Sequence, residues 1–121
     1  NMFGDILSNA AVAMSGSLGL AAAINAGDTR AIANAGHGSA PDIAGQGIAN
    51  PTGLVLSATM LIEWIGNKNG LNSYADAAAA IHRSVDSVLA DPATRTRDLG
   101  GSCSTADFTT AIISALRKSA G

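Results

Sequence analysis

The sequence predicts a mostly helical fold with very little β-strand. Three segments carry apolar residues at helical spacing, at residues 53–65, 73–89 and 104–118. Only residues 30–35 are typical of a strand, and residues 37–51 form a long loop interrupted by glycine and proline. One strand cannot form a sheet by itself, so we expect its partner strands to come from outside this chain.

The first two helical segments have recognisable boundaries. Pro51 precedes the first, where the amide proton that proline lacks is not needed. Gly66 and Asn67 are expected to stop that helix. The second segment should end before Asp91–Pro92, because a residue that precedes proline is disfavoured in helical conformation.

The other helices begin with capping residues. Ser104 or Thr105 can cap the third segment, and Asp107 suits its first turn because a carboxylate is favourable near a helix N-terminus. Residues 5–14 also have helical character, and Asp5 on its own is a plausible cap for them.

The composition predicts a globular protein with a limited core. The 121 residues suffice for one domain, 47% of them are hydrophobic and 13% are charged. Aromatic residues make up only 3%, so we expect a core of Ala, Ile, Leu, Val and Met. Alanine buries little area per residue, which predicts a piece that leans on a partner surface.

Charge and cysteine content exclude several classes of protein. A net charge of −2 gives no reason to expect nucleic acid or an anionic membrane as a partner. No apolar run approaches the roughly 20 residues of a membrane-spanning helix, and Asn1–Ser8 is not a secretory signal. Cys103 is the single cysteine, so an internal disulfide is excluded. The cytoplasm is the expected compartment.

The loop at residues 37–51 is the strongest functional feature. It places His, Ser, Asp, Gln and Asn among glycines, and a loop of this length in a compact domain is usually functional or disordered. These residue types favour function. The sequence has no GxGxxG fingerprint of the Rossmann type.

Four segments carry a family resemblance. HGSAPDIAGQGIANP, His37–Pro51, is similar to the cofactor loop of the metal-dependent β-decarboxylating dehydrogenases, the isocitrate and isopropylmalate dehydrogenase family. NMFGDILS (Asn1–Ser8), GSLGL (Gly16–Leu20) and RTRDLGG (Arg95–Gly101) resemble three further family segments, in the expected order. The resemblance implies an α/β fold in which residues 1–121 form the C-terminal portion of the large, NAD-binding domain. The N-terminal and small-domain parts would then lie outside this chain, which also begins with Asn1 rather than methionine.

By this resemblance, a set of residues binds NAD: Leu18, Gly19, His37, Gly38, Ser39, Ala40, Asp42, Ile43, Asn50 and Asp98. His37–Ala40 would lie along the adenosine portion and Asn50 would reach the adenine. Leu18 and Gly19 would pass near the nicotinamide end. Asp98 would border the adenine pocket.

Asp42 indicates which dinucleotide is used. A carboxylate at this position can accept hydrogen bonds from both ribose hydroxyls of NAD and would repel the 2′-phosphate of NADP. Family members that use NADP carry lysine and tyrosine at the positions of Asp42 and Ile43. The resemblance therefore implies NAD.

The resemblance also implies a site for Mg²⁺ or Mn²⁺ at Asp5 and Asn9. The family has two aspartates four residues apart, a spacing that places both on one helix face. Hard cations prefer oxygen ligands, and the carbonyl oxygen of Asn9 can still serve as one. The departure from aspartate nevertheless removes one negative charge.

The function implied is NAD-dependent oxidative decarboxylation of a 2-hydroxy acid such as 3-isopropylmalate or isocitrate, by a homodimer or higher oligomer. Catalytic residues would lie outside this chain, so we expect the isolated 121 residues to be inactive. Asn9 motivates an alternative, a non-catalytic or regulatory-type subunit or an inactive fragment. A third alternative, an independent small helical domain, predicts cooperative folding of these residues as a monomer.

Overall fold

The structure is a computed structural model and describes residues 1–119. Its four helices and two strands are α1 (Met2–Ser15), β1 (Ala22–Ala26), β2 (Ala31–Ala35), α2 (Thr52–Asn69), α3 (Asn72–Ala90) and α4 (Thr105–Ser119). Short 3₁₀ turns occupy Leu18–Leu20, Pro41–Ile43, Pro92–Thr94 and Arg97–Leu99. The expected α/β, mostly helical character is confirmed.

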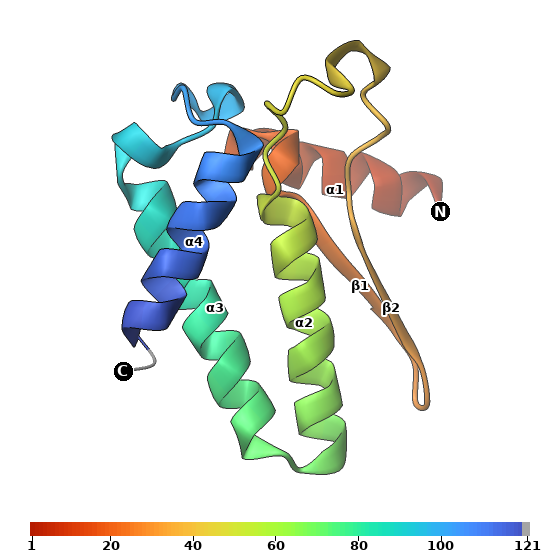
Figure 1. Cartoon of the computed structure of the whole chain (residues 1–121). Coiled ribbons are helices and arrows are strands. Elements are labelled where there is room, and N and C mark those ends of the chain that lie inside the picture. Colours follow the sequence, from red (N-terminus) through yellow and green to blue (C-terminus); the bar gives the residue numbers. More distant parts are fainter. Residues whose placement is uncertain (120–121) are drawn as a thin grey trace.

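The helices and the hairpin form a layered arrangement. Helix α2 packs against α3 and against both strands, and α3 packs against α4. Figure 1 shows α1 lying across the end of this assembly at which α2 and α4 begin. The long loop after β2 lies at the same end, so this end gathers three separate segments of the chain (Figure 1).

The core lies between α3 and α4. Its buried members are Val85, Val88, Phe108 and Ile112, and the fully buried Phe108 is the largest of them. Partly buried neighbours extend it toward α2 and the turn before α4: Val55, Leu56, Ile81, Leu89, Cys103, Ala111 and Ala115. The expectation of a core without aromatics was wrong, because Phe108 is fully buried in this cluster although aromatic residues are scarce in the sequence.

The partner of the predicted strand lies within this chain. Strands β1 and β2 pair antiparallel, with register Ala22↔Ala35 at one end and Ala26↔Ala31 at the other. The expectation of external partners for this strand was therefore wrong. Alanine and asparagine have low β-propensity, so the sequence of β1 gives a weak local signal.

Ser57 of α2 connects the helix to both strands of the hairpin. Its buried Oγ accepts a hydrogen bond from the Ala23 amide at 3.2 Å and donates to the carbonyl oxygen of Asn34 at 2.8 Å. Ala23 and Asn34 are paired in the hairpin register. Packing against α2 thus supports strands that local propensity would not.

Gly66 does not end α2, contrary to the sequence prediction. The helix continues to Asn69 and ends at Gly70, which has the left-handed φ of 65°. A Cβ atom at the buried Gly66 would lie 2.7 Å from the Cβ of Tyr74, at the start of α3. Glycine at this position permits close approach of the two helices. In the sequence, a glycine needed for helix packing cannot be told apart from one that ends a helix.

The start of α4 confirms one of the two predicted caps. The Ser104 Oγ accepts a hydrogen bond from the Asp107 amide at 3.1 Å and donates to its carboxylate at 2.7 Å. Asp5, by contrast, does not cap α1. The helix begins at Met2 with Asn1 as the preceding residue, so Asp5 lies within the first turn.

Helix α1 is covered little by the rest of the chain. All its residues are exposed except the half-buried Val12. The exposed set includes large apolar side chains: Met2, Phe3, Ile6, Leu7 and Met14. In the part of the chain that the structure describes, none of the helices combines the length and apolar character needed to cross a membrane.

Candidate functional site

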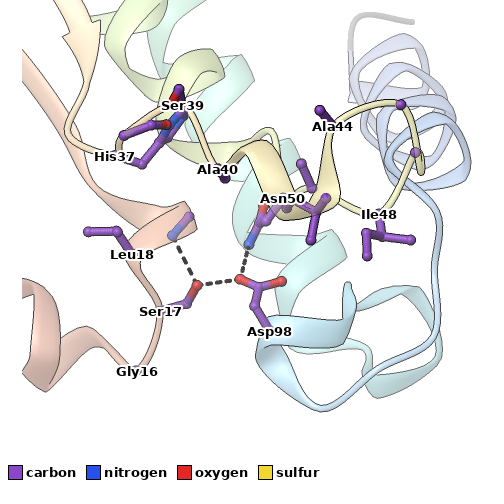
Figure 2. A pocket seen from close by; sticks show the side chains of 16 residues that line it. Gly16, Ser17, Leu18, His37, Ser39, Ala40, Ala44, Ile48, Asn50 and Asp98 are labelled. Carbon is purple, nitrogen blue, oxygen red and sulfur yellow. Dashed lines mark hydrogen bonds between the residues drawn. The ribbon is translucent and has the colours of Figure 1, made fainter.

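A cavity of about 750 Å³ opens where three segments of the chain meet (Figure 2). Residues 16–19 follow α1, residues 37–50 form the loop between β2 and α2, and Asp98 belongs to the connection between α3 and α4. The loop that provides most of the lining residues lies at the end of the molecule where α2 and α4 begin (Figure 1).

The structure brings together nine of the ten residues predicted to bind the cofactor: Leu18, Gly19, His37, Gly38, Ser39, Ala40, Ile43, Asn50 and Asp98 all line the cavity. Asp42 does not line it. Asp42 lies exposed in the turn Pro41–Ile43, where its carbonyl oxygen accepts a hydrogen bond from the Gln46 side chain at 2.7 Å.

Seven further residues line the cavity that the sequence reasoning did not single out: Gly16, Ser17, Ala44, Gly45, Gly47, Ile48 and Ala49. All of them lie inside two of the segments that resemble the family, residues 16–20 and 37–51, so the resemblance of those segments was the available signal. Ser17 is the most important residue missing from the predicted set, because its side chain is hydrogen-bonded to Asp98.

The Asp98 carboxylate is the centre of this network. Its Oδ2 accepts hydrogen bonds from the Ser17 hydroxyl and from Asn50 Nδ2, the latter at 2.9 Å (Figure 2). Its Oδ1 accepts from the buried Thr96 hydroxyl at 2.6 Å. Side chains from all three segments that form the cavity therefore meet at one carboxylate.

The backbone is also closely packed at this point. A Cβ atom at Gly19 would lie 2.7 Å from the Asn50 Cβ and 3.1 Å from Asp98 Oδ2. Only glycine allows residues 18–20 to approach the end of the loop in this way. Ala40 has a φ of 44°, in the left-handed region that few residues other than glycine adopt, and such strain is common at functional sites.

The second half of the loop is anchored to α4. The Thr105 amide donates to the carbonyl oxygen of Gly47 at 2.8 Å, and its hydroxyl donates to that of Ala49 at 2.5 Å. The Asn50 Oδ1 accepts from the Thr52 amide at 3.0 Å, which ties the loop to the start of α2. The end of the loop is therefore held by two helices.

The hydrogen bonds around Asp98 determine its charge. Burial by itself would raise the pKa of the carboxyl, but the hydrogen bonds from Ser17, Thr96 and Asn50 outweigh burial and lower it below the ordinary value of 3.8. Asp98 is therefore ionised at neutral pH, the state in which it can accept all three bonds.

This shift predicts a pH dependence confined to acid. Because the folded pKa is lower than the unfolded one, the stability that Asp98 contributes is complete above pH 3.8 and is lost as the pH falls through the folded pKa. Denaturant unfolding measured from about pH 6 to about pH 2 should show a loss of stability in acid that Asp98→Asn reduces. Asp86→Asn, at an exposed position of α3, should leave that loss unchanged.

The two residues predicted to bind metal lie apart from the cavity lining. Asp5 and Asn9 are one turn apart on α1, and both are exposed. Within residues 1–119, no group of three or more His, Cys, Asp or Glu side chains is placed to hold a metal ion. These two residues provide at most part of a coordination shell.

Comparison with known proteins identifies the family of this chain. Residues 1–112 match the sequence profile of the family described as isocitrate/isopropylmalate dehydrogenase. The isocitrate/homoisocitrate dehydrogenase of Thermus thermophilus is 48% identical over 117 residues, covering 97% of this chain and 33% of the relative. Isocitrate dehydrogenase (NAD) subunit 2, mitochondrial, of Kluyveromyces lactis is 49% identical, covering 96% of this chain and 30% of the relative.

Solved structures show the same similarity. The crystal structure of isocitrate dehydrogenase from Methylococcus capsulatus superposes with a TM-score of 0.86 at 43% identity, covering 97% of this chain and 33% of that one. The chain thus spans about a third of the length of the relatives that it matches. Sequence and fold together establish that this chain belongs to the isocitrate/isopropylmalate dehydrogenase family.

Proposed function

We propose that these residues are part of an NAD-dependent dehydrogenase that oxidatively decarboxylates a 2-hydroxy acid, with 3-isopropylmalate and isocitrate as the leading substrates. In this proposal the chain is the C-terminal portion of the large domain and supplies the NAD-binding loop and part of the metal site. The cavity formed by residues 16–19, residues 37–50 and Asp98 is the observation that carries the proposal.

The cavity suits the adenosine portion of a dinucleotide. Gly38, Gly45 and Gly47 let a ligand approach the backbone closely, and Ser39 and Asn50 offer polar groups. Leu18, Ile43 and Ile48 provide apolar surface for a planar base. Apolar walls with a few placed polar groups are typical of cofactor sites.

Asp42 supports NAD rather than NADP. Its turn, Pro41–Ile43, adjoins the cavity through Ile43, and its carboxylate is exposed. An exposed carboxylate beside a ribose can accept hydrogen bonds from its hydroxyls and repels an additional phosphate. The Kluyveromyces lactis relative carries NAD in its name.

Asp5 and Asn9 fit as two of the roughly six oxygen ligands of Mg²⁺ or Mn²⁺, with the remaining ligands coming from substrate, water and residues outside this chain. A metal ion held there would supply Lewis acidity to the substrate oxygens, and NAD would be the hydride acceptor. The role of this chain is then to hold the dinucleotide and to orient part of the metal shell.

The test is an assay of the full-length enzyme with NAD, Mg²⁺ or Mn²⁺ and a panel of 3-isopropylmalate, isocitrate, homoisocitrate and tartrate. Metal-dependent formation of NADH with release of carbon dioxide supports the proposal. Direct titration with NAD, in parallel, tests binding separately from turnover. A protein that binds no NAD contradicts the proposal.

Asn9 favours a second candidate, a non-catalytic or regulatory-type subunit that keeps the nucleotide site. Replacing a carboxylate by an amide removes one negative charge from a site for a divalent cation, and ligand charge is one determinant of cation affinity. NAD binding without metal-stimulated turnover on any substrate would support this candidate.

Asn9→Asp is expected to strengthen Mg²⁺ binding by about tenfold in the full-length protein, because it restores the second carboxylate. The apparent affinity is measured by titrating Mg²⁺ into the enzyme with substrate present. Asn67→Asp, at an exposed position near the end of α2, is the matched control and should leave the affinity unchanged. An Asn9→Asp protein with unaltered Mg²⁺ affinity would remove Asn9 from the metal site.

The expected homodimer or higher oligomer and the cytoplasmic location stay predictions. The exposed apolar side chains of α1, among them Phe3 and Leu7, support a surface that is covered in the complete enzyme.

A further inference from the structure

The Asp98 carboxylate accepts three hydrogen bonds from other side chains of the protein. A carboxylate offers about four acceptor positions, and protein donors from Ser17, Asn50 and Thr96 occupy three of them. Hydrogen bonds to an ionised acceptor are stronger than those between neutral groups. The carboxylate is therefore used chiefly inside the protein.

Two of these donors, Ser17 and Asn50, connect the network to further residues. The Ser17 Oγ accepts a hydrogen bond from the Gly19 amide at 3.0 Å, which shapes the turn at Leu18–Leu20 (Figure 2). The Asn50 amide group donates to Asp98 through Nδ2 and accepts through Oδ1 from Thr52. The orientation of the Asn50 side chain is thereby determined from both ends.

We propose that Asp98 is a positioning residue, which holds residues 17–19 and Asn50 together so that the cavity has its ligand-binding shape before a ligand arrives. The inference rests on the proposed NAD site and differs from the expectation that Asp98 itself borders the adenine. Its effect on binding passes through Ser17 and Asn50.

The experiment measures NAD affinity and steady-state kinetics of the full-length enzyme carrying Asp98→Ala. Removing the carboxylate leaves three donors without their acceptor, so residues 17–19 and Asn50 are no longer held together. NAD binding should weaken by about tenfold, the change that about 1.4 kcal/mol produces in an equilibrium constant. The KM for NAD should rise in parallel, while kcat at saturating NAD stays within about twofold of wild type. Asp86→Ala, on the exposed face of α3, is the control and should change neither quantity.

A double-mutant cycle with Ser17→Ala separates positioning from direct contact. If Asp98 acts through Ser17, the loss of affinity in the double variant should be smaller than the two single losses combined. Fully additive losses, or an Asp98→Ala protein that binds NAD as the control does, would overturn the inference.

Asp98→Asn keeps the shape of the side chain and serves if Asp98→Ala does not fold. It should weaken NAD binding in the same direction but less, because one oxygen remains as an acceptor. Wild-type affinity in Asp98→Asn would overturn the inference. A wild-type enzyme that binds no NAD would instead contradict the proposed function, and the inference would fall with it.

Discussion

Asp42→Lys combined with Ile43→Tyr is expected to reverse the cofactor preference of the enzyme, from NAD to NADP. The double change replaces an acceptor for the ribose hydroxyls by a cation, and the new tyrosine hydroxyl can donate to a 2′-phosphate. The ratio of kcat/KM for NADP to that for NAD should rise by at least about a hundredfold, since each 1.4 kcal/mol contributes a factor of about ten. The measurement is kcat/KM with each dinucleotide at fixed metal and substrate.

Asp28→Lys is the matched control for this change in charge. Asp28 is exposed in the turn between β1 and β2, and that turn lies at the opposite end of the molecule from the loop after β2 (Figure 1). The control should leave the preference unaltered, because exposed charges separated by more than a Debye length are largely screened. If the double variant kept its preference for NAD, Asp42 would not contact the ribose.

Ile112→Ala is expected to reduce the free energy of unfolding by about 2–5 kcal/mol, the usual cost of a large cavity in a packed core. Ile112 is 6% exposed and packs with Val85, Val88 and Phe108. Alanine would remove most of its apolar contacts between α3 and α4. Denaturant unfolding of the 121-residue chain measures the loss.

Ile113→Ala makes the same chemical change one residue along the same helix. Ile113 is 44% exposed, so its truncation should cost less than about 1 kcal/mol. Equal losses in the two variants would mean that α4 does not pack against α3 through the face described here. An unmeasurable transition in the wild-type chain would mean that the core requires the rest of the enzyme for stability.

Local sequence patterns predicted the helices better than the strands. Apolar spacing identified most of α2, α3 and α4. In α3 and α4 the buried residues include apolar ones such as Val85 and Phe108, whereas α2 buries only small or polar residues. Strand β1 was missed because its alanines carry little local preference, and its hydrogen bond to Ser57 of α2 joins residues 34 positions apart. Gly66 was misread for a related reason, since its close contact with Tyr74 is not visible from the local sequence.

The site was predictable where it depends on a continuous segment. The resemblance of the loop and of the short segment after α1 assigned His37, Asn50 and Leu18 to one cofactor site, and in the structure all three line one cavity. The network around Asp98 could not be predicted, because Ser17 and Asp98 are 81 positions apart in sequence. Whether Asp42 contacts a ribose and whether Asp5 and Asn9 bind metal stay predictions.

The anchoring of the loop to the start of α4 constrains the length of the chain between Asp98 and Thr105. Asp98 is hydrogen-bonded to Asn50, and Thr105 is hydrogen-bonded to Gly47 and Ala49. Both ends of this short connection are therefore attached to the same part of the loop. An inserted or deleted residue between Asp98 and Thr105 would shift one of these residues relative to the other, so that both could not keep their hydrogen bonds to the loop. The hairpin turn at residues 27–30 lies at the opposite end of the molecule from the loop after β2 (Figure 1), and it is closed by its own hydrogen bond, from the Gly27 amide to the Arg30 carbonyl oxygen. Related chains should therefore vary in length at that turn much more readily than in the connection from Asp98 to Thr105.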